Sequence, residues 1–375
     1  MPNERIPDMG STITIEKPVF NLLLSRLKEE GYLPIGPRVK NETLVYEEIE
    51  SIDDLPQGYS TEQKPGNFRL VHEKHSRFFD IIPGAQSWKQ FLFPSQTELF
   101  AMRKNGKSWE ISSQPMETPK YAFIGVRACE LAAIQIQDGI FMREDFTDPH
   151  YRARRIHAFV ISVNCTQPAG TCFCTSMGTG PRVKEEFDVN LTELDDVFVL
   201  TIGSEVARRL LAGIPFDDAS GYILSNVERK LEHAEHQMTR KLESSDLPNL
   251  IIDHLDHPYW LEIGKRCLSC TNCTQVCPTC FCWDTQDEMS LDGKTTRRNR
   301  LWDSCFNPGY SHQAGGNTRP TIYSRYRQWL SHKLGTWKQQ FGTLGCVGCG
   351  RCITWCPAEI DITEEIAALR NEVNR

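Results

Sequence analysis

The sequence lacks any apolar run long enough to cross a bilayer. A transmembrane helix needs about 20 apolar residues, whereas the longest runs here, such as Ala158–Val163, have the length of a strand. The first residues, MPNERIPDMGST, also lack the basic-then-apolar order of a secretory signal. We therefore expect a cytoplasmic protein with no membrane span.

Several motifs of common enzymes are also missing. The sequence has no G-x-G-x-x-G after a strand, no P-loop, no H-E-x-x-H and no G-x-S-x-G. These absences argue against a flavin or nucleotide site in this chain. The formal net charge of −7 gives no indication of nucleic-acid binding. We expect no catalytic residue in this chain. We expect it to act as a conduit whose donor and acceptor are other proteins.

Hydrophobic patterning predicts an α+β chain with three regions. Residues 1–115 are mixed, residues 116–245 alternate strands and helices as an α/β-type domain does, and residues 246–375 have little strand signal. The last region predicts a helical ferredoxin-like domain. The predicted strands are Tyr121–Val126, Ala158–Val163 and Val197–Ile202; the predicted helices are Phe20–Glu30, Glu130–Asp138, Glu205–Ala212, a charged linker helix over 222–243, Pro320–Leu334 and a helix opening at Asp361.

Cysteine is abundant, with 15 residues in the chain. A long chain without a secretion signal does not need disulfides, so clustered thiols indicate metal binding. Two segments share the spacing C-x2-C-x2-C-x3-C-P of two-cluster bacterial ferredoxins. They contain Cys267, Cys270, Cys273 and Cys277 before Pro278, and Cys346, Cys349, Cys352 and Cys356 before Pro357.

In such a motif the first three thiolates wrap one cluster and the fourth reaches the other cluster. We therefore assign Cys267, Cys270, Cys273 and Cys356 to one [4Fe–4S] cluster, and Cys346, Cys349, Cys352 and Cys277 to a second. Structural zinc is the alternative, but zinc sites favour pairs of ligands separated by a longer loop. The long insertion between the motifs distinguishes the chain from a compact ferredoxin.

A second set of cysteines lies in the α/β-type region: Cys129, Cys165, Cys172 and Cys174. Cys129 and Cys165 each follow a predicted strand. If those strands are parallel neighbours, both thiols lie at the carboxyl edge of the sheet, where α/β domains bind ligands. Cys172-Phe-Cys174 then lies in a loop over this edge, and residues 176–181 (SMGTGP) allow close backbone approach. The set predicts a third [4Fe–4S] cluster; buried structural cysteines and zinc are the alternatives.

Cys280, Cys282 and Cys305 remain outside these sets. Three interpretations are open: they are alternative cluster ligands, they form a further metal site, or they pack beside the clusters. We favour packing.

The insertion from Lys294 to Lys338 is basic, with Asp303 as its one acidic residue. We interpret its cations as raising cluster potentials and docking acidic partners. A solvated helix face and nucleic-acid binding are the alternatives.

Longer stretches of the sequence resemble a known family. The stretches Cys267-Leu-Ser-Cys270, Cys277-Pro-Thr-Cys-Phe-Cys282, Trp302-Asp-Ser-Cys305 and Gly345-Cys-Val-Gly-Cys-Gly-Arg-Cys352 resemble the β subunit of cytoplasmic NAD(P)-linked [NiFe] hydrogenases, or sulfhydrogenases. They are also similar to the A subunit of anaerobic sulfite reductase. Val126-Arg-Ala-Cys-Glu130 and the stretch through Cys172, Cys174 and Pro181 fit the same families, so the resemblance covers roughly residues 120–365.

The resemblance implies an iron–sulfur electron-transfer subunit in a heteromeric oxidoreductase. Its partners would be a flavin subunit that meets NAD(P)H and the [NiFe] hydrogenase subunits, or a sirohaem subunit in the sulfite reductase case. The resemblance also supports the third cluster at Cys129, Cys165, Cys172 and Cys174. Two alternatives come from other classes: a zinc-stabilised nucleic-acid-binding module and a metal-free scaffold.

The ferredoxin spacing makes a direct prediction for Cys352. Replacing Cys352 with Ala is expected to remove or convert one C-terminal cluster, because the cluster loses one of its four thiolates. Electron paramagnetic resonance of the reduced protein measures this loss, and a wild-type signal intensity in the variant would contradict the assignment.

Overall fold

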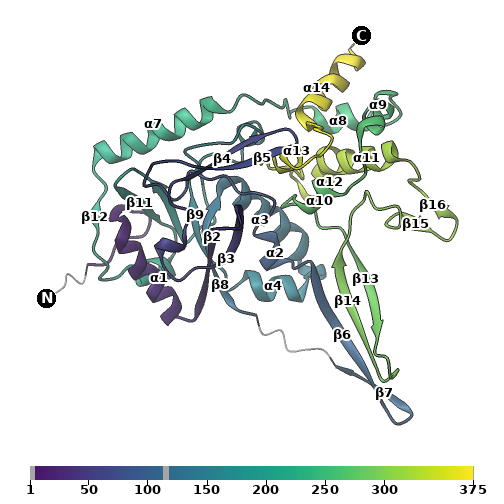
Figure 1. Cartoon of the computed structure of the whole chain (residues 1–375), viewed down its shortest axis with the longest axis horizontal. Helices are drawn as coiled ribbons and strands as arrows, with labels where there is room; N and C mark the ends of the chain where they lie inside the picture. The colour runs from purple at the N-terminus through teal and green to yellow at the C-terminus, as the bar shows by residue number, and fades with distance from the viewer. Residues whose placement is uncertain (1–4, 113–117, 375) are drawn as a thin grey trace.

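The computed structural model describes residues 5–112 and 118–374. The body of the molecule is built around one large sheet (Figure 1). Its strands are β1 (Thr12–Glu16), β2 (Tyr32–Lys40), β3 (Thr43–Glu48), β8 (Lys120–Arg127), β9 (Phe159–Val163), β10 (Val189–Glu193), β11 (Val197–Ile202) and β12 (Asp217–Asp218). They lie in the order β12-β1-β11-β10-β9-β8-β2-β3, and the central strands β2, β8, β9 and β10 are parallel.

The predicted strands Tyr121–Val126, Ala158–Val163 and Val197–Ile202 form as β8, β9 and β11. The condition on which the third site depended is met, because β8 and β9 are parallel neighbours. Strands β1 to β3, from the predicted mixed region, join the same sheet. The domain boundaries predicted near residues 115 and 245 stay predictions. Strands that precede residue 115 and strands that follow it share this sheet.

Successive side chains of β8 point to opposite faces of the sheet and pack into the core on each face. Ala122 and Ile124 lie in the core with α1 (Phe20–Glu29) and α6 (Glu205–Leu210), whereas Phe123 lies in the core with α3 (Ala128–Phe141). A bulge at Gly125, where φ is +92°, interrupts the alternation just before α3 begins. The helices predicted over Phe20–Glu30, Glu130–Asp138 and Glu205–Ala212 form as α1, α3 and α6. Smaller elements are α2 (Lys89–Leu92), α4 (Pro149–Arg155), α5 (Cys174–Met177) and the hairpin of β4 (Tyr59–Lys64) and β5 (Asn67–His72).

The predicted linker helix forms as α7 (Gly221–Gln237), which runs along the body in Figure 1. It ends six residues earlier than predicted. Met238 leaves the helix with an extended ψ of 100° and is buried beside the thiol of Cys174. The burial of one apolar side chain therefore stops the helix, which periodicity in the sequence does not reveal.

The C-terminal part is a helical unit with its own core. It contains α8 (Leu247–Ile252), α9 (Tyr259–Arg266), α10 (Asn272–Gln275), α11 (Ile322–Ser331), a π-helical turn over His332–Thr336, α12 (Trp337–Phe341), α13 (Arg351–Thr354) and α14 (Ile362–Val373). Trp260, Trp329 and Ile366 meet in this core. The helix predicted after Asp361 forms as α14, capped by the Asp361 side chain.

The predicted α+β class is confirmed. No helix within the described ranges has the length and apolar character needed to cross a membrane.

A β-sheet arm projects from the body, and this feature departs from the helical prediction for residues 246–375 (Figure 1). It pairs β13 (Trp283–Met289) and β14 (Thr295–Trp302) with β6 (Gln96–Asn105) and β7 (Ser108–Ser112). All residues of β13 are exposed. Because neither face of β13 is buried, its sequence shows no apolar alternation, and the strand could not be predicted. A short hairpin, β15 (His312–Gln313) with β16 (Gly316–Asn317), follows.

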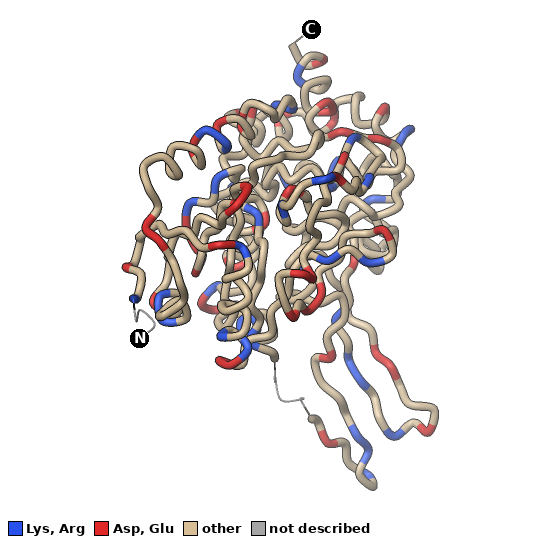
Figure 2. Tube along the Cα trace, turned by 60° about the vertical axis from the view of Figure 1, so that its left-hand side comes forward, with Lys and Arg blue, Asp and Glu red and all other residues tan. Residues whose placement is uncertain are grey.

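Three arginines of the insertion pair with acidic residues outside it. On the arm, stretches of Lys and Arg lie beside stretches of Asp and Glu on neighbouring strands (Figure 2). Arg298 binds Asp287 on β13, Arg297 lies 3.3 Å from Glu98 on β6, and Arg300 pairs with Asp148. These three arginines are therefore paired, and the docking and nucleic-acid interpretations of this span stay predictions.

The helical unit meets the sheet-containing body at a tight backbone seam. Phe173 N–H donates to the carbonyl of Gly348 at 2.9 Å, and Thr171 and Thr354 share a hydrogen bond of 2.8 Å between their hydroxyls. Gly348 and Gly350 have φ of +64° and +75°. A Cβ at Gly348 would lie 2.7 Å from Cys174 Cα, and one at Gly350 would overlap the carbonyl of Thr171. Only glycine permits this approach.

The seam predicts a difference between two glycine substitutions. Gly342 also has a positive φ, +77°, but has open space around its Cα. Gly342→Ala is expected to lose about 1–2 kcal/mol of stability from its left-handed backbone alone. Gly350→Ala is expected to lose about 1–3 kcal/mol more, because its methyl group forces the seam apart. Thermal unfolding under anaerobic conditions compares the two, and equal melting temperatures would show that the seam tolerates a side chain.

Candidate metal centres

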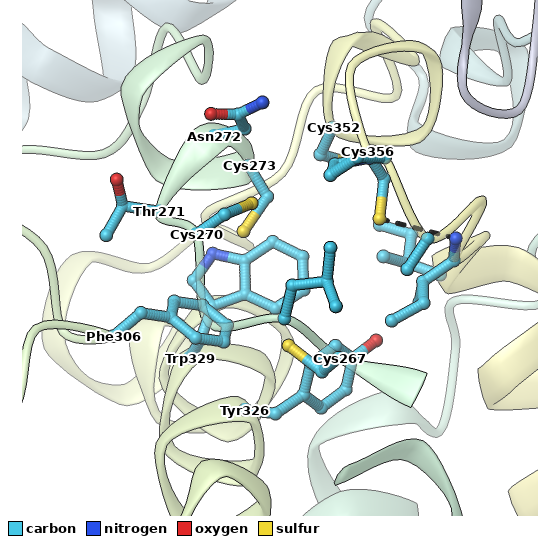
Figure 3. Close-up of a pocket in the computed structure, with 15 residues that line it drawn as sticks. Cys267, Cys270, Thr271, Asn272, Cys273, Phe306, Tyr326, Trp329, Cys352 and Cys356 are labelled. Atoms are coloured by element: carbon cyan, nitrogen blue, oxygen red, sulfur yellow. Dashed lines mark hydrogen bonds between the residues drawn. The ribbon is translucent and has the colours of Figure 1, made fainter. Parts of the chain in front are cut away.

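The first candidate site is a cavity between the two cysteine motifs (Figure 3). Its lining includes Cys267, Cys270, Cys273 and Cys356, the set predicted for one cluster, together with Cys352. The structure therefore brings the last cysteine of the second motif to the first three of the first motif, as crossed ligation requires. Apolar side chains form much of the remaining wall: Phe306, Tyr326, Trp329, Ile360 and Ile362.

The two motifs fold with the same backbone turns. In the first motif, Ser269 and Thr271 have φ of +53° and +69°. In the second motif, Gly348 and Gly350 occupy the same offsets with φ of +64° and +75°. Left-handed residues at these positions turn the chain back between successive cysteines, so that the thiols face one centre. Ser269 and Thr271 are not glycine, and such backbone strain is typical of functional sites.

Backbone N–H groups point at the sulfurs of both motifs. Ser269 N–H donates to Cys267 Sγ at 3.4 Å, and Gly348 N–H donates to Cys346 Sγ at 3.5 Å. Cys356 Sγ accepts from the N–H of Ile360 at 3.4 Å, the dashed line of Figure 3. These donors stabilise thiolate sulfur, and hydrogen bonds to ligand sulfurs are one factor that sets the potential of an iron–sulfur cluster.

The second candidate site gathers Cys346, Cys349 and Cys352 with Cys277 of the first motif. Burial raises the pKa of the Cys346 thiol to about 12, with Cys349 and Cys277 as neighbouring sulfurs. Burial also raises the pKa of Cys352, and the sulfurs of Cys346, Cys349 and Cys277 raise it further. The four predicted ligands thus lie within electrostatic reach of one another. Without metal the thiols of Cys346 and Cys352 stay protonated, so metal binding has to displace their protons.

Lys333 is a buried cation at this second site. Its ammonium lies 3.3 Å from Cys277 Sγ and donates to Thr279 Oγ1 at 2.9 Å and to the Gly345 carbonyl at 2.7 Å. Burial disfavours the charge, but the sulfurs of Cys277, Cys280 and Cys346 outweigh burial and hold the pKa of Lys333 above its usual value. Lys333 fits the prediction of a cation beside a cluster, and so does Arg325 of the same insertion, which is buried and whose charge acts on Cys267 of the first group.

The third candidate site lies at the carboxyl edge of the main sheet. Cys165, Cys172 and Cys174 form a small buried group with Ile82, Ala169 and Met238, and Cys129 packs against it. Cys129 follows β8 at the start of α3, and Cys165 follows β9. Burial, then the sulfur of Cys165, raises the pKa of Cys172 to about 12. The structure therefore brings all four predicted residues together.

The glycine-rich segment 176–181 approaches this third group closely. A Cβ at Gly180 would lie 2.9 Å from the sulfur of Cys174, so the backbone itself forms part of the wall. Met238 closes another side, with its sulfur 3.6 Å from that of Cys174. Nothing in the sequence placed Met238 here, because it follows a charged helix and lies far from the cysteines along the chain.

A buried ion pair links the second and third groups. Arg351 follows Cys349 and lies 2.6 Å from Glu130, which follows Cys129; the exposed fractions of the two side chains are 2% and 1%. Arg351 also donates to the carbonyls of Gly84 and Gln86 at 3.1 and 3.2 Å. Burial raises the pKa of Cys349, which Arg351 opposes. Burial and then the sulfurs of Cys174 and Cys349 raise the pKa of Cys129.

The sequence alone assigned no role to Glu130, and the structure shows that its carboxylate is a buried hydrogen-bond acceptor. Besides Arg351, its carboxylate accepts from the Tyr46 hydroxyl and from Trp88 Nε1, each at 3.2 Å. Every such donor comes from another part of the chain. The sequence feature that could have indicated this ion pair is the opposite charge of Glu130 and Arg351, each directly beside a predicted ligand.

The leftover cysteines lie beside these sites. Cys280, Cys282 and Cys305 pack in or against the core of the helical unit. Lys89, also buried, donates to the Cys280 carbonyl at 3.2 Å and packs its ammonium 3.8 Å from the centre of a Trp302 ring. Burial lowers the pKa of Lys89 to about 8.

The described residues contain no group of three or more His, Cys, Asp or Glu side chains spaced for a single metal ion. A cubane places each thiolate on a different iron, so its ligands stand farther apart than the ligands of one ion. Four thiols around a largely apolar cavity, with backbone N–H groups aimed at sulfur, fit a [4Fe–4S] cluster.

Comparisons with known proteins agree with this chemistry. Residues 266–360 match the model of the 4Fe-4S dicluster domain family. The chain is 29% identical over 361 residues to sulfhydrogenase 2 subunit beta of Pyrococcus furiosus, covering 96% of this chain and 98% of that protein. No solved structure matches. The resemblance to a sulfhydrogenase β subunit is thereby confirmed, and it extends over nearly the whole chain, beyond the predicted 120–365.

The position of Lys333 predicts a shift in potential. Lys333→Met is expected to make the nearby cluster harder to reduce, by on the order of 100 mV, because a buried positive charge favours the more negative reduced state. Lys338→Met removes an equal charge from an exposed position and serves as the control. Redox titration followed by electron paramagnetic resonance measures both variants, and equal potentials would refute a tuning role for Lys333.

Proposed function

We propose that this chain is the iron–sulfur electron-transfer subunit of a multisubunit oxidoreductase of the hydrogenase or sulfhydrogenase type. The observation that carries the proposal is the serial arrangement of the three cysteine groups. Cys352 belongs to the second group and also lines the cavity of the first. Cys349, also of the second group, is an electrostatic neighbour of Cys129 and Cys174 in the third. The second group therefore lies between the other two.

The proposal assigns a cluster to each group. Cys267, Cys270, Cys273 and Cys356 would hold one [4Fe–4S] cluster; Cys346, Cys349, Cys352 and Cys277 the second; and Cys129, Cys165, Cys172 and Cys174 the third. A [4Fe–4S] cluster takes up and releases one electron at a time. The chain's own residues bury the third site and supply fixed charges and N–H donors to the sites.

The first group would be the exit to a partner, because it reaches the surface. Cys270 is exposed, and Leu268 beside it has an exposed fraction of 64%. The third group is buried behind Met238, with Cys165, Cys172 and Cys174 each at most 8% exposed. A series of one-electron sites with one end at an apolar surface loop suits transfer to another protein subunit.

The partners follow from the relative, whose name denotes one subunit of a sulfhydrogenase. We propose a flavin subunit that meets NAD(P)H on one side and [NiFe] hydrogenase subunits on the other, in the cytoplasm. The A subunit of anaerobic sulfite reductase is the alternative. Purifying the native complex through this chain separates the two, since nickel in the complex supports the first and sirohaem supports the second.

Metal analysis tests the number of clusters. Protein purified without oxygen is expected to contain about twelve iron and about twelve acid-labile sulfide atoms per chain, and Cys172→Ser is expected to lose about four of each. Cys305→Ala, which removes a cysteine outside the three groups, serves as the control and should keep the full content. About eight iron atoms in the wild type would restrict the clusters to the helical unit. Stoichiometric zinc in place of iron would overturn the proposal.

A further inference from the structure

Two of the leftover cysteines lie together at the base of the arm. Strands β13 and β14 pair Trp283 with Trp302, and the next hydrogen bond continues the ladder from Asp303 N–H to the Cys282 carbonyl at 2.9 Å. Cys305 follows two residues later. The register of the hairpin therefore holds Cys282 and Cys305 at one place, although 22 residues separate them in the sequence.

The sulfur of Cys282 is the acceptor of several hydrogen bonds. The thiol and the backbone N–H of Cys305 and the hydroxyl of Tyr310 all donate to it. Two thiols within hydrogen-bond reach are closer than two cluster ligands that bind different irons. Thiols in hydrogen-bond contact are neighbours that can be joined as a disulfide with a small side-chain rotation.

The pair also lies between the two C-terminal cysteine groups. Cys273 of the first group is an electrostatic neighbour of Cys305. Cys280, a neighbour of both Cys282 and Cys305, is hydrogen-bonded to Cys277 of the second group. Tyr310, with an exposed fraction of 41%, connects the pair to solvent. The two thiols thus have a one-electron site on each side and a hydroxyl that leads to the surface.

We propose that Cys282 and Cys305 form a redox-active pair that alternates between dithiol and disulfide. This rests on the proposed function, which supplies the one-electron carriers. On reduction the S–S bond breaks and each sulfur gains one electron; Cys305 also gains a proton, whereas Cys282 stays a thiolate that accepts the hydrogen bond from the Cys305 thiol. The two electrons come one each from the reduced clusters of the two C-terminal groups, which are oxidised by one electron apiece, and the proton comes from solvent by way of Tyr310. Oxidation reverses every step.

The pair would couple one-electron transfer along the clusters to two-electron chemistry. The hydrogen bond from the Cys305 thiol outweighs burial, and with Tyr310 it lowers the pKa of Cys282 to about 6. A thiolate is the reactive form in disulfide exchange. The third leftover cysteine, Cys280, has a different position, as a hydrogen-bond partner of the Cys277 thiol.

Electron counting on the full chain tests the pair. Oxidised wild-type protein, loaded with its clusters, is expected to accept about two more electrons per chain in a dithionite titration than Cys305→Ser or Cys282→Ser. Anaerobic alkylation and mass spectrometry should find Cys282 and Cys305 linked in the oxidised protein and alkylated in the reduced protein. Cys280→Ser is the matched control and should keep both the link and the electron count.

Three outcomes would overturn the proposal that Cys282 and Cys305 form a redox-active pair. Equal electron uptake by the wild type and both variants would do so, as would a disulfide to Cys280 instead. A loss of about four iron atoms in Cys282→Ser or Cys305→Ser would show that these residues are cluster ligands. The proposed function fails separately, through a wild-type protein without iron. If Cys305→Ser does not fold, the half-buried Cys282→Ser gives the same measurement.

Discussion

The buried contact between Arg351 and Glu130 is the interaction on which the arrangement of the sites depends. A buried charge that loses its partner destabilises a protein by about 3–5 kcal/mol, so the two residues constrain each other strongly. Each is directly beside a predicted ligand, since Arg351 precedes Cys352 and Glu130 follows Cys129. The ion pair and the glycine seam beside it hold the helical unit against the sheet edge. Together they determine that the second and third cysteine groups are neighbours rather than separate sites in two domains.

Fixed charge is distributed unevenly around the cysteine groups. Lys333 lies against Cys277, Lys89 lies near Cys280, and Arg351 lies beside Cys349. The arginines of the arm are instead occupied by Asp287, Glu98 and Asp148. A cation in a buried site favours added negative charge far more than one in water, because the local dielectric constant is lower. Under the proposed function the buried cations therefore bear on redox behaviour, whereas Arg297 and Arg298 bind within the arm and Arg300 binds Asp148 of the body.

The sheet and the arm show two different relations between sequence and fold. Strands β8 and β9 are buried runs that their apolar character alone predicted, whereas their parallel pairing was a condition that the structure meets. Strands β7 and β13 of the arm are exposed throughout, and β6 and β14 pair although they lie about 200 residues apart in the sequence. Such pairing leaves no periodic signal in either segment. Met238 illustrates the same limit, since a helix that ends to bury one side chain among distant cysteines looks continuous in the sequence.

The sequence by itself determined the chemistry of the candidate sites, because cysteine spacing is local and the repeated C-x2-C-x2-C-x3-C-P motif specifies the ligand type and the turns between ligands. It also identified Cys129, Cys165, Cys172 and Cys174 as one set, since strand ends in a parallel sheet share an edge. Only the tertiary structure decided which groups adjoin, which cations are buried beside sulfur, and that Cys282 lies against Cys305. Those relations come from packing between segments far apart in the chain, and no local pattern records them.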